Sequence, residues 1–370
     1  MWQLLVALCL AQGLGDAVLC TGASHDNPEQ FMNISQIICF HGYYSEEHQV
    51  LTEDGYFLTM NRIPGGREEA GSRGPKLPVL LQHGLVLDGS NWVSNFPSTS
   101  LGFILADAGY DIWIGNSRGN SWSRRHLNLS VDQEEFWDFS FHEMAVYDLP
   151  AMVGFILRQT GQEKLFYIGH AQGNSLGFIA FSSMPQLAEK IKMFFVLGPA
   201  YALHTGKGPV LSLFYLPDAI IKVIFGKKEG ALLGQEQRAA LARVCSCRLL
   251  GRFCADGLFL AGGFNEKNLY TTAKTEEFKQ FDYGEENKEK YNQTSPPFYR
   301  TEDMMVPTAL WSGGEDWVTS TEETQCLLPR ITKLVCHEHF PDWNHWDHIW
   351  GLDAPQRMYR QIVALMEQNP

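Results

Sequence analysis

Apolar runs that suit buried strands alternate with helix-like segments through the first half of the chain. The strand candidates are short and end in Gly-containing turns, at residues 78–82, 110–115, 165–168 and 193–197. The helix candidates between them occupy residues 101–108, 148–159 and 173–183. In the second of these helices, Asp148 stands at the expected N-cap and Pro150 near the first turn. Strands that alternate with helices predict a mainly parallel sheet with right-handed crossovers.

The pattern changes between about residues 201 and 300. Strand candidates become rare, and apolar helical stretches that carry Lys and Glu replace them, at residues 220–225 and 241–250. The alternation then resumes, with strands at residues 307–311 and 334–340 and helices at residues 321–328 and 354–366. We therefore expect an α/β core in two sequence blocks, residues 20–200 and 301–370, with a helical cap inserted at residues 201–300.

The N-terminal residues 1–15 are apolar and carry no charged side chain. This stretch is too short to span a bilayer but has the length of a signal-peptide core. We expect a signal peptide over residues 1–19; a buried N-terminal strand or helix is the alternative. Three N-x-[ST] sequons, at Asn33, Asn128 and Asn292, agree with passage through the secretory route and are candidate glycosylation sites.

The composition narrows the class of protein. The 370 residues carry a formal net charge of −13, with 29 Lys and Arg against 42 Asp and Glu. This balance argues against nucleic acid as a partner, because phosphates require a basic surface. Only 19% of the residues are charged and 12% are aromatic, which excludes intrinsic disorder. Beyond the N-terminus, no run of about 18 apolar residues predicts a membrane span.

Three of the eight cysteines, Cys245, Cys247 and Cys254, lie close together in the expected cap. One local disulfide would fit an oxidising compartment, and Cys245 with Cys254 would close a short loop. Buried free thiols are the alternative.

The segment GHAQG at residues 169–173 lies between a predicted strand and a predicted helix. It has the frame of the nucleophile elbow, G-x-S-x-G, in which a sharp turn presents the central residue and the glycines let the strand and helix approach. The central residue here is Ala171, which has no nucleophilic atom and cannot form an acyl-enzyme. The frame thus predicts the place of a nucleophile whose reactive atom is missing.

Downstream segments supply an acid and a histidine in the order that follows the nucleophile in α/β-hydrolases. Asp316 follows a predicted strand and a Gly turn in WSGGED, and His345 lies in NHWDH ahead of the last helix. In this arrangement the Asp316 carboxylate would hold the tautomer of His345, and His345 would act as general base. A turn aspartate and a structural loop histidine are the alternatives.

The segment QHGL at residues 82–85 follows another predicted strand. In this fold the loop at that place supplies one oxyanion-hole amide, and the residue after the nucleophile supplies the other. We assign these roles to the backbone N–H groups of Leu85 and Gln172. A plain Gly turn is the alternative for the loop.

Long stretches of the chain resemble the acid lipase family, which includes gastric lipase and lysosomal acid lipase. They cover nearly all of the chain after about Asn27, at residues 33–35, 52–56, 61–64, 81–85, 100–110, 115–120, 147–150, 177–182 and 348–355. The resemblance implies an α/β-hydrolase core with a helical cap and lid, secretion or delivery to the lysosome, and hydrolysis of triacylglycerols or sterol esters. It also implies that Cys245 and Cys254 form the family's disulfide.

Two departures from the family bear on function. The family has Ser where this chain has Ala171, and its following Thr-Thr pair is here Asn174 and Ser175. The segment after residues 263–269 is also shorter than in the family, so we expect a truncated cap. Loss of the nucleophile in a comparable serine hydrolase costs about 10⁶ in turnover. We therefore predict a lipid-binding lipase homologue that has lost ester hydrolysis and holds a neutral lipid or lipid ester in an apolar pocket, with contact to a lipid interface as a further expectation.

An active lipid ester hydrolase is the alternative function. It would require Ser175 as a substitute nucleophile, or an engineered exchange of the family's Ser for Ala171. Ser175 lies about 5–6 Å along the helix from the elbow. That displacement misses the geometry needed to meet both His345 and the oxyanion amides.

A metal site is the third possibility. His337 and His339 lie on one face of a predicted strand, and Asp342, His345 and His348 are close in sequence. The spacing fits no H-E-x-x-H helix motif. We expect no metal and no cofactor, with solvated or core histidines instead.

Overall fold

The computed structural model describes residues 28–69, 74–85, 87–201 and 278–370. The chain divides into two compact units, Met1–Asn33 with Tyr215–Phe264 and Ile34–Phe214 with Asn265–Pro370. The elements below belong to the second unit; a short 3-10 helix, Pro28–Phe31, belongs to the first. The expected signal peptide, the helical stretches of the expected cap and the expected disulfide lie outside the described residues. These expectations, and the three-part division of the chain, remain predictions.

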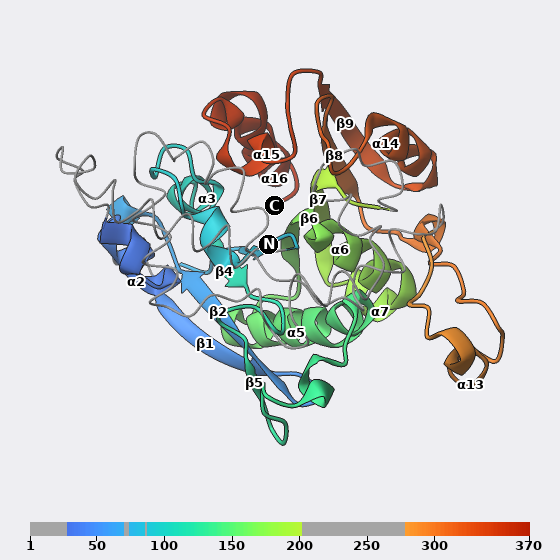
Figure 1. Cartoon of the computed structure of the whole chain (residues 1–370). Coiled ribbons are helices and arrows are strands. Elements are labelled where there is room, and N and C mark those ends of the chain that lie inside the picture. The colour runs from blue at the N-terminus through green and yellow to red at the C-terminus, as the bar shows by residue number, and fades with distance from the viewer. Residues whose placement is uncertain (1–27, 70–73, 86, 202–277) are drawn as a thin grey trace, which may run out of the picture. The chain divides into compact units, whose positions relative to one another are not determined.

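A nine-stranded sheet forms the centre of the second unit (Figure 1). Its strands are β1 (Glu46–Leu51), β2 (Tyr56–Ile63), β3 (Pro78–Gln82), β4 (Asp111–Gly115), β5 (Arg125–His126), β6 (Leu165–Ala171), β7 (Ile191–Pro199), β8 (Thr308–Gly313) and β9 (Leu334–Phe340). They lie in the order β1-β2-β4-β3-β6-β7-β8-β9, and β5 pairs with β2. β2 pairs antiparallel with β1, β4 and β5, and every other pair is parallel. The predicted mainly parallel α/β sheet is therefore confirmed.

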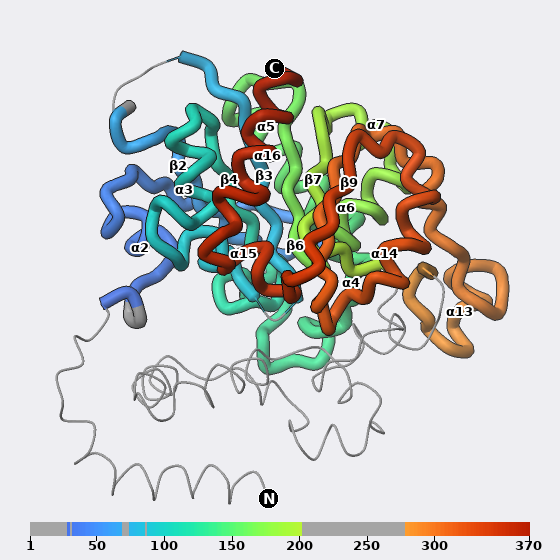
Figure 2. Tube along the Cα trace, turned by 90° about the horizontal axis from the view of Figure 1, so that it is seen from above, coloured from blue at the N-terminus to red at the C-terminus, as the bar shows by residue number. Residues whose placement is uncertain are grey.

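Helices cover both faces of the sheet. They are α2 (Ile34–Phe40), α3 (Leu101–Asp107), α4 (Phe141–Glu143), α5 (Leu149–Thr160), α6 (Gln172–Ser183), α7 (Pro185–Ala188), α13 (Asn287–Tyr291), α14 (Thr321–Leu327), α15 (Asp347–Trp350) and α16 (Arg360–Glu367). α5 and α6 lie on one side of the sheet, and α3 and α16 on the other (Figure 1 and Figure 2). Because both faces are covered, β3, β4, β6 and β8 are buried at every position. None of the helices in the described ranges is long and apolar enough to cross a membrane.

The helix that contains α5 begins further upstream than predicted. Ser140 and Glu143 form a capping box at the start of α4, and the helix continues through a π turn, Met144–Asp148, into α5. Asp148 therefore has helical backbone angles, φ −67° and ψ −51°, and makes no capping hydrogen bond. The predicted N-cap at Asp148 is wrong. Pro150 has no N–H to donate to the preceding turn, and the widened π turn lies directly before it.

The Asp148 carboxylate binds a buried arginine instead. Nε of Arg118 donates to Oδ1 of Asp148 at 2.8 Å, and Nη2 donates to Asp54 at 2.9 Å. The guanidinium also lies over the ring of Tyr56, 4.1 Å from its centroid. Two carboxylates and an aromatic face thus compensate the burial of this charge. The cluster joins the turn between β1 and β2, the loop after β4 and the start of α5.

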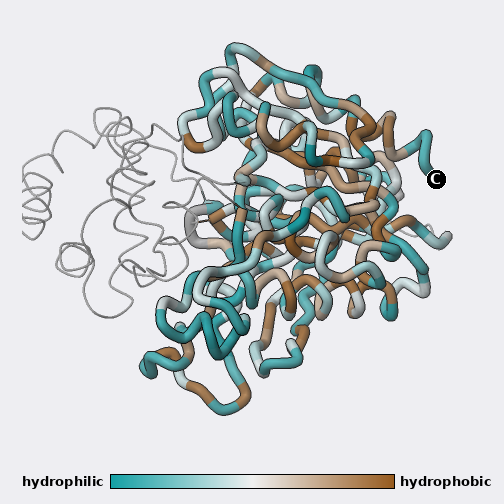
Figure 3. Tube along the Cα trace, turned by 90° about the vertical axis from the view of Figure 1, so that its right-hand side faces the viewer, coloured by the Kyte–Doolittle hydropathy of each residue, from teal (hydrophilic) through white to brown (hydrophobic). Residues whose placement is uncertain are grey.

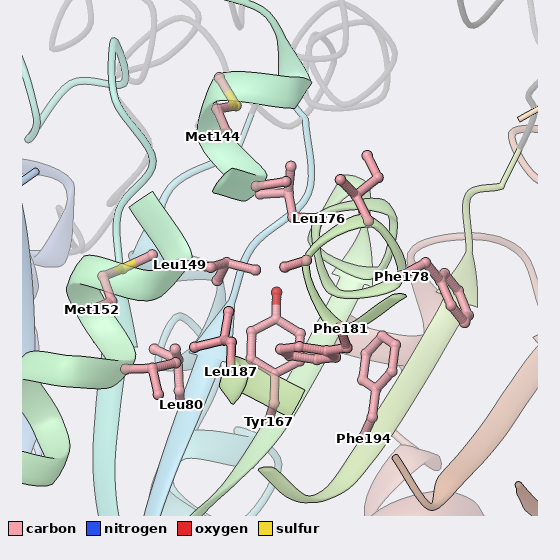
Figure 4. Packing of buried hydrophobic residues seen from close by; sticks show 14 of the residues in the cluster. Leu80, Met144, Leu149, Met152, Tyr167, Leu176, Phe178, Phe181, Leu187 and Phe194 are labelled. Atoms are coloured by element: carbon pink, nitrogen blue, oxygen red, sulfur yellow. The ribbon is translucent and has the colours of Figure 1, made fainter. Parts of the chain in front are cut away.

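The main hydrophobic core lies between the sheet and the helices α5, α6 and α7. Figure 4 shows Tyr167 and Phe194, from β6 and β7, packed against Phe181 of α6, and Leu80 of β3 on the side of Met152 of α5. Figure 3 shows hydrophobic positions gathered in the interior elements and hydrophilic positions at the outer loops. The Tyr167 hydroxyl donates to the carbonyl of Gly173 at 2.7 Å, so its polar atom is satisfied within the core. This packing fixes β6 against the first turn of α6, where the candidate site lies.

Candidate active site

Ala171 ends β6 and directly precedes α6. Its backbone has φ 49° and ψ −116°, a conformation that residues other than glycine rarely adopt and that costs about 1–3 kcal/mol. A Cβ at Gly173 would overlap the carbonyl oxygen of Gln82, and a Cβ at Gly169 would lie 2.6 Å from the side chain of Asn174. Both glycines are therefore needed for the close approach of strand and helix. The sharp strand-to-helix turn of a nucleophile elbow is present, with a methyl group at its centre.

The loop after β3 runs beside this elbow. A Cβ at Gly84 would lie 2.9 Å from the Cβ of Ala171, so only glycine fits there. Leu85 follows Gly84, and Gln172 follows Ala171 as the first residue of α6. The N–H of a first helical residue has no carbonyl partner within its helix. The backbones of both expected oxyanion-hole residues thus come within one residue of the Gly84–Ala171 approach, and their role stays a prediction.

His83 holds the same loop in place. Its Nε2 accepts from the N–H of Ser117 at 3.1 Å, so the ring proton is on Nδ1, which donates to the carbonyl of Gly84 at 2.8 Å. Burial lowers the pKa of His83, in agreement with a neutral ring. This role of His83 was not predicted, although its place in the QHGL segment is a usable signal.

Asp316 and His345 meet just beyond the end of β8. Nδ1 of His345 lies 2.8 Å from Oδ2 of Asp316, and the side chains are 3% and 0% exposed. The N–H groups of Val318 and Thr319 donate to the other Asp316 oxygen, and the Thr319 hydroxyl donates to Oδ2 at 2.6 Å. Burial alone would raise the pKa of Asp316, but the charge and hydrogen bond of His345 and the hydrogen bond from Thr319 outweigh it and hold that pKa well below its usual range. The structure thus brings together the two residues that we call the acid–histidine pair.

The second ring nitrogen of His345 has no hydrogen-bond partner among the described residues. Across the described ranges, no hydrogen bond involves Nε2 of His345, whereas Nδ1 is bound to Asp316. The ring lies against the end of β7, since a Cβ at Gly198 would be 3.3 Å from Nδ1. The next residue of β7, Pro199, pairs with Ala171 in the sheet. The His345 ring therefore lies near the strand end that pairs with the elbow, and Nε2 is the nitrogen that would take a proton from a nucleophile.

Two further histidines hold the backbone of His345. Nε2 of His170 and Nδ1 of His348 each lie 3.2 Å from the carbonyl oxygen of His345, which accepts from both. Both rings are fully buried. Burial is the main cause that lowers the pKa of His170 well below its usual value and that of His348 to about 4, so both rings are neutral at neutral pH. We call His170 and His348 the carbonyl clamp; the sequence analysis did not identify it.

The pair that replaces the family's Thr-Thr ties α6 to the end of β7. Asn174 donates from Nδ2 to the carbonyl of Leu197 at 2.8 Å, and the Ser175 hydroxyl donates to the carbonyl of Ala200 at 2.7 Å. In the described part of the chain, the Ser175 hydroxyl makes no hydrogen bond to His345. The structure therefore does not bring Ser175 and the acid–histidine pair together.

The remaining predicted positions lie away from this site or outside the description. His337 and His339 both hydrogen-bond the Ser312 hydroxyl, at 3.0 Å each, and Asp342 pairs with Arg357. Among the residues that the structure describes, no group of three His, Cys, Asp or Glu side chains is placed to hold a metal ion. Of the three sequon residues, Asn128 and Asn292 are exposed and Asn33 is half-buried.

Family models match most of the chain. The alpha/beta hydrolase fold family matches residues 78–352, and the partial alpha/beta-hydrolase lipase region matches residues 34–96. A membrane phospholipase A has the same fold, with a TM-score of 0.53 at 14% identity over 100% of both chains. An esterase from Pyrococcus furiosus gives a TM-score of 0.51 at 12% identity over 90% of this chain and 92% of its own. The chain is an α/β-hydrolase.

Closer relatives define the family more narrowly. Mouse lipase member M is 47% identical over 396 residues, which cover 100% of this chain and 93% of the relative. Human lysosomal acid lipase/cholesteryl ester hydrolase is 49% identical over 368 residues, which cover 92% of each chain. Human lipase member N is 44% identical over 394 residues, 99% of each. The chain belongs to the acid lipase family, α/β-hydrolases of lipid metabolism, as the sequence predicted.

Proposed function

We propose that this protein is a lipid-binding member of the acid lipase family that does not hydrolyse esters. The observation that carries the proposal is the methyl group of Ala171 at the centre of the elbow. The acid–histidine pair beside it is complete, but no atom at residue 171 can attack a carbonyl. In a comparable hydrolase, loss of the nucleophile removes about 10⁶ of turnover, and only the oxyanion hole and binding remain.

The ligand class follows from the relatives. One of them, 49% identical, is named a lysosomal acid lipase and cholesteryl ester hydrolase, which confirms the expected secreted or lysosomal location. Neutral lipids and lipid esters, such as triacylglycerols and sterol esters, are therefore the ligands we propose. Leu85 and Gln172 would supply the N–H groups that face the lipid carbonyl, because their backbones flank Ala171.

Comparison with lipase member M supports a shortened chain. The alignment runs over 396 residues, more than the 370 of this chain, so the relative has residues that this chain lacks. This agrees with the truncated cap predicted after residues 263–269, a region outside the description. We propose that lipid access in this protein differs from that in relatives with the longer cap.

The alternative, an active ester hydrolase, has weaker support. The Ser175 hydroxyl already donates to the carbonyl of Ala200 at 2.7 Å, and Ser175 lies about one helical turn beyond Ala171. A proton passed to His345 from that position would require a different helix geometry. An engineered exchange at Ala171 would leave the rest of the machinery unchanged and would have the same inactive phenotype.

Ester turnover by the purified secreted protein tests the proposal. We expect no hydrolysis of a short-chain or a long-chain p-nitrophenyl ester above that of the His345→Ala variant, which serves as the matched control. Turnover near that of an active lipase, abolished by His345→Ala, would show that another nucleophile works and would overturn the proposal. In that case Ser175→Ala identifies whether Ser175 supplies it.

A further inference from the structure

We infer that the site binds the carboxylate of a free fatty acid in preference to an ester, with the imidazole of His345 and the first amides of α6 as its partners. This inference rests on the proposed function, since it requires that the site binds lipid without cleaving it. It goes further by naming the head group. Alanine in place of serine removes a hydroxyl that would donate to His345. The remaining hydrogen-bonding groups can therefore bind a different lipid head group.

The unused nitrogen of His345 is the first reason. Asp316 occupies Nδ1, and no described residue occupies Nε2, although the ring is 97% buried. In an active relative the nucleophile's hydroxyl would donate to this nitrogen. Without the hydroxyl, a protonated His345 has an N–H donor beside the elbow with no acceptor. A carboxylate oxygen can fill the place of the missing hydroxyl oxygen and accept from it.

The start of α6 is the second reason. This helix has 12 residues, and its first N–H groups lie directly after Ala171. Such N–H groups have no partner within the helix, and the helix dipole favours an anion near them. The Gly84 backbone approaches the Ala171 Cβ from the other side, which brings the Leu85 loop to the same place. The first amides of α6, the Leu85 loop and the ring of His345 therefore lie in one region, and we place the acyl head group there.

The charges around His345 are the third reason. Among the residues that the structure describes, the titratable side chains that face it are the Asp316 carboxylate, the His170 ring from the end of β6 and the His348 ring from α15. Asp347, also on α15, is turned to the N–H of Asn344. Asp316 is ionised, and burial keeps the two clamp histidines neutral. A proton taken up when an anion binds would therefore reside on His345.

An ester and an acid differ in how they satisfy this arrangement. An ester carbonyl accepts from the amides but carries no charge to stabilise a protonated His345. A carboxylate accepts from the amides with one oxygen and from Nε2 with the other, so its binding is coupled to proton uptake. Acid affinity should therefore rise as the pH falls, as long as the ligand itself stays ionised. Ester affinity should change little over the same range.

Calorimetric titration with octanoate and methyl octanoate, at pH 6 and pH 8, tests the inference. Both ligands have the same short chain, and octanoate is ionised at both pH values because carboxyl pKa values lie near 4–5. At pH 6 we expect octanoate to bind at least about tenfold tighter than the ester, and at least about tenfold tighter than at pH 8. Titrations in two buffers of different protonation enthalpy should show uptake of a proton with octanoate and none with the ester.

Two variants separate the possible outcomes. Ala171→Ser returns a hydroxyl to Nε2 and is titrated with octanoate alone, because this variant is expected to cleave the ester; octanoate should bind it more weakly at pH 6 than it binds the parent protein. His345→Gln should abolish the preference for octanoate over methyl octanoate and the proton uptake. Equal, pH-independent binding of both ligands would overturn the inference and leave the proposed lipid binding intact. If the parent protein binds neither ligand, or if the parent protein hydrolyses methyl octanoate, the proposed function fails as well. Thermal unfolding of each variant shows whether a lost preference reflects a lost fold; if His345→Gln does not fold, the octanoate affinity of Ala171→Ser decides, and an affinity equal to that of the parent protein would overturn the inference.

Discussion

The elbow around Ala171 and the acid–histidine pair are two halves of one site, and they differ in what they retain. The pair has every expected contact: Asp316 binds His345 at 2.8 Å and accepts three more hydrogen bonds from its own loop. The elbow keeps its positive φ and its glycines but presents a methyl group. The backbone geometry of an active site is thus fixed by packing and by glycine, independently of the atom that performs the chemistry.

The same comparison separates the free-energy cost of the strained backbone at Ala171 from the catalytic benefit of that strain. The positive φ of Ala171 costs free energy, which an active enzyme recovers in catalysis. Here the core under β6, with Tyr167 bound to the Gly173 carbonyl, is what maintains the turn. Variants that act on one half of the site and not on the other can test this separation.

The largest expected effect is on the acid–histidine pair. In an Ala171→Ser background, Asp316→Asn should lower turnover about 10⁴-fold, because an amide does not hold His345 as the Nδ1–H tautomer. Thr319→Val is the matched control: it removes one of the hydrogen bonds to Asp316 and leaves the pair, so it should cost about tenfold or less. Steady-state hydrolysis of a short-chain ester measures both. Equal losses in the two variants would show that Asp316 acts only as part of its loop.

The next effect is on stability as the pH falls. The folded pKa of His348 is about 4 and that of His170 is well below its usual value, whereas an unfolded histidine titrates near 6.5. The unfolded chain therefore binds more protons below pH 6.5, and each histidine should cost about 1.4 kcal/mol of stability per pH unit down to about pH 4. The depressed pKa of Asp316 works in the same direction, with its contribution lost only at lower pH.

Urea unfolding between pH 7 and pH 4.5 measures this slope. His348→Asn keeps a donor at the place of Nδ1 but does not titrate, so it should reduce the slope by about one proton. A slope that stays the same in His348→Asn would contradict the neutral, buried state of the clamp.

A smaller effect is expected from the carbonyl clamp. In the Ala171→Ser background, His170→Leu removes a donor to the His345 carbonyl and should lower kcat about 10²-fold by displacing the ring, with KM nearly unchanged. His170→Gln can place an N–H at the position of Nε2 and should recover most of the loss. A rise in KM without a change in kcat, or equal effects of Leu and Gln, would argue for a purely structural role.

The smallest effect isolates the strain of the elbow. Ala171→Gly should stabilise the protein by about 1 kcal/mol, because relief of the positive φ exceeds the entropic cost of a new glycine. Ala180→Gly, in the interior of α6, is the comparison and should destabilise by about 1 kcal/mol. Denaturant unfolding measures both changes: the midpoint of Ala171→Gly should lie above that of the parent protein, and the midpoint of Ala180→Gly below it. Destabilisation by both would show that the turn at Ala171 stores no strain.

Much of the fold could be predicted from the sequence. The strands at residues 78–82 and 334–340 have the predicted bounds, because each is an apolar or alternating run between turn residues. β6 and β7 extend past their predicted ends, since their small and polar residues are held by neighbouring strands rather than by their own propensity. The hairpin of β1 and β2 was not assigned, and β1 is polar along most of its length.

The site divides in the same way. Motif order placed Ala171, Asp316 and His345, and the structure brings the last two into contact. The carbonyl clamp joins His170 to His345 across 175 positions of sequence, a contact that no local pattern encodes. At Asp148 a clear local pattern was misleading. The sequence predicts an N-cap there, but the Asp148 carboxylate forms an ion pair with Arg118 instead.

The central claim is that one missing atom at residue 171 blocks hydrolysis at an otherwise complete site. Its most direct measurement is the turnover of a short-chain ester by the protein with Ala171 and by the Ala171→Ser variant, side by side. We predict that the serine raises turnover by up to about 10⁶ and that His345→Ala abolishes the gain. Equal turnover by the two proteins, whether high or absent, would contradict the claim.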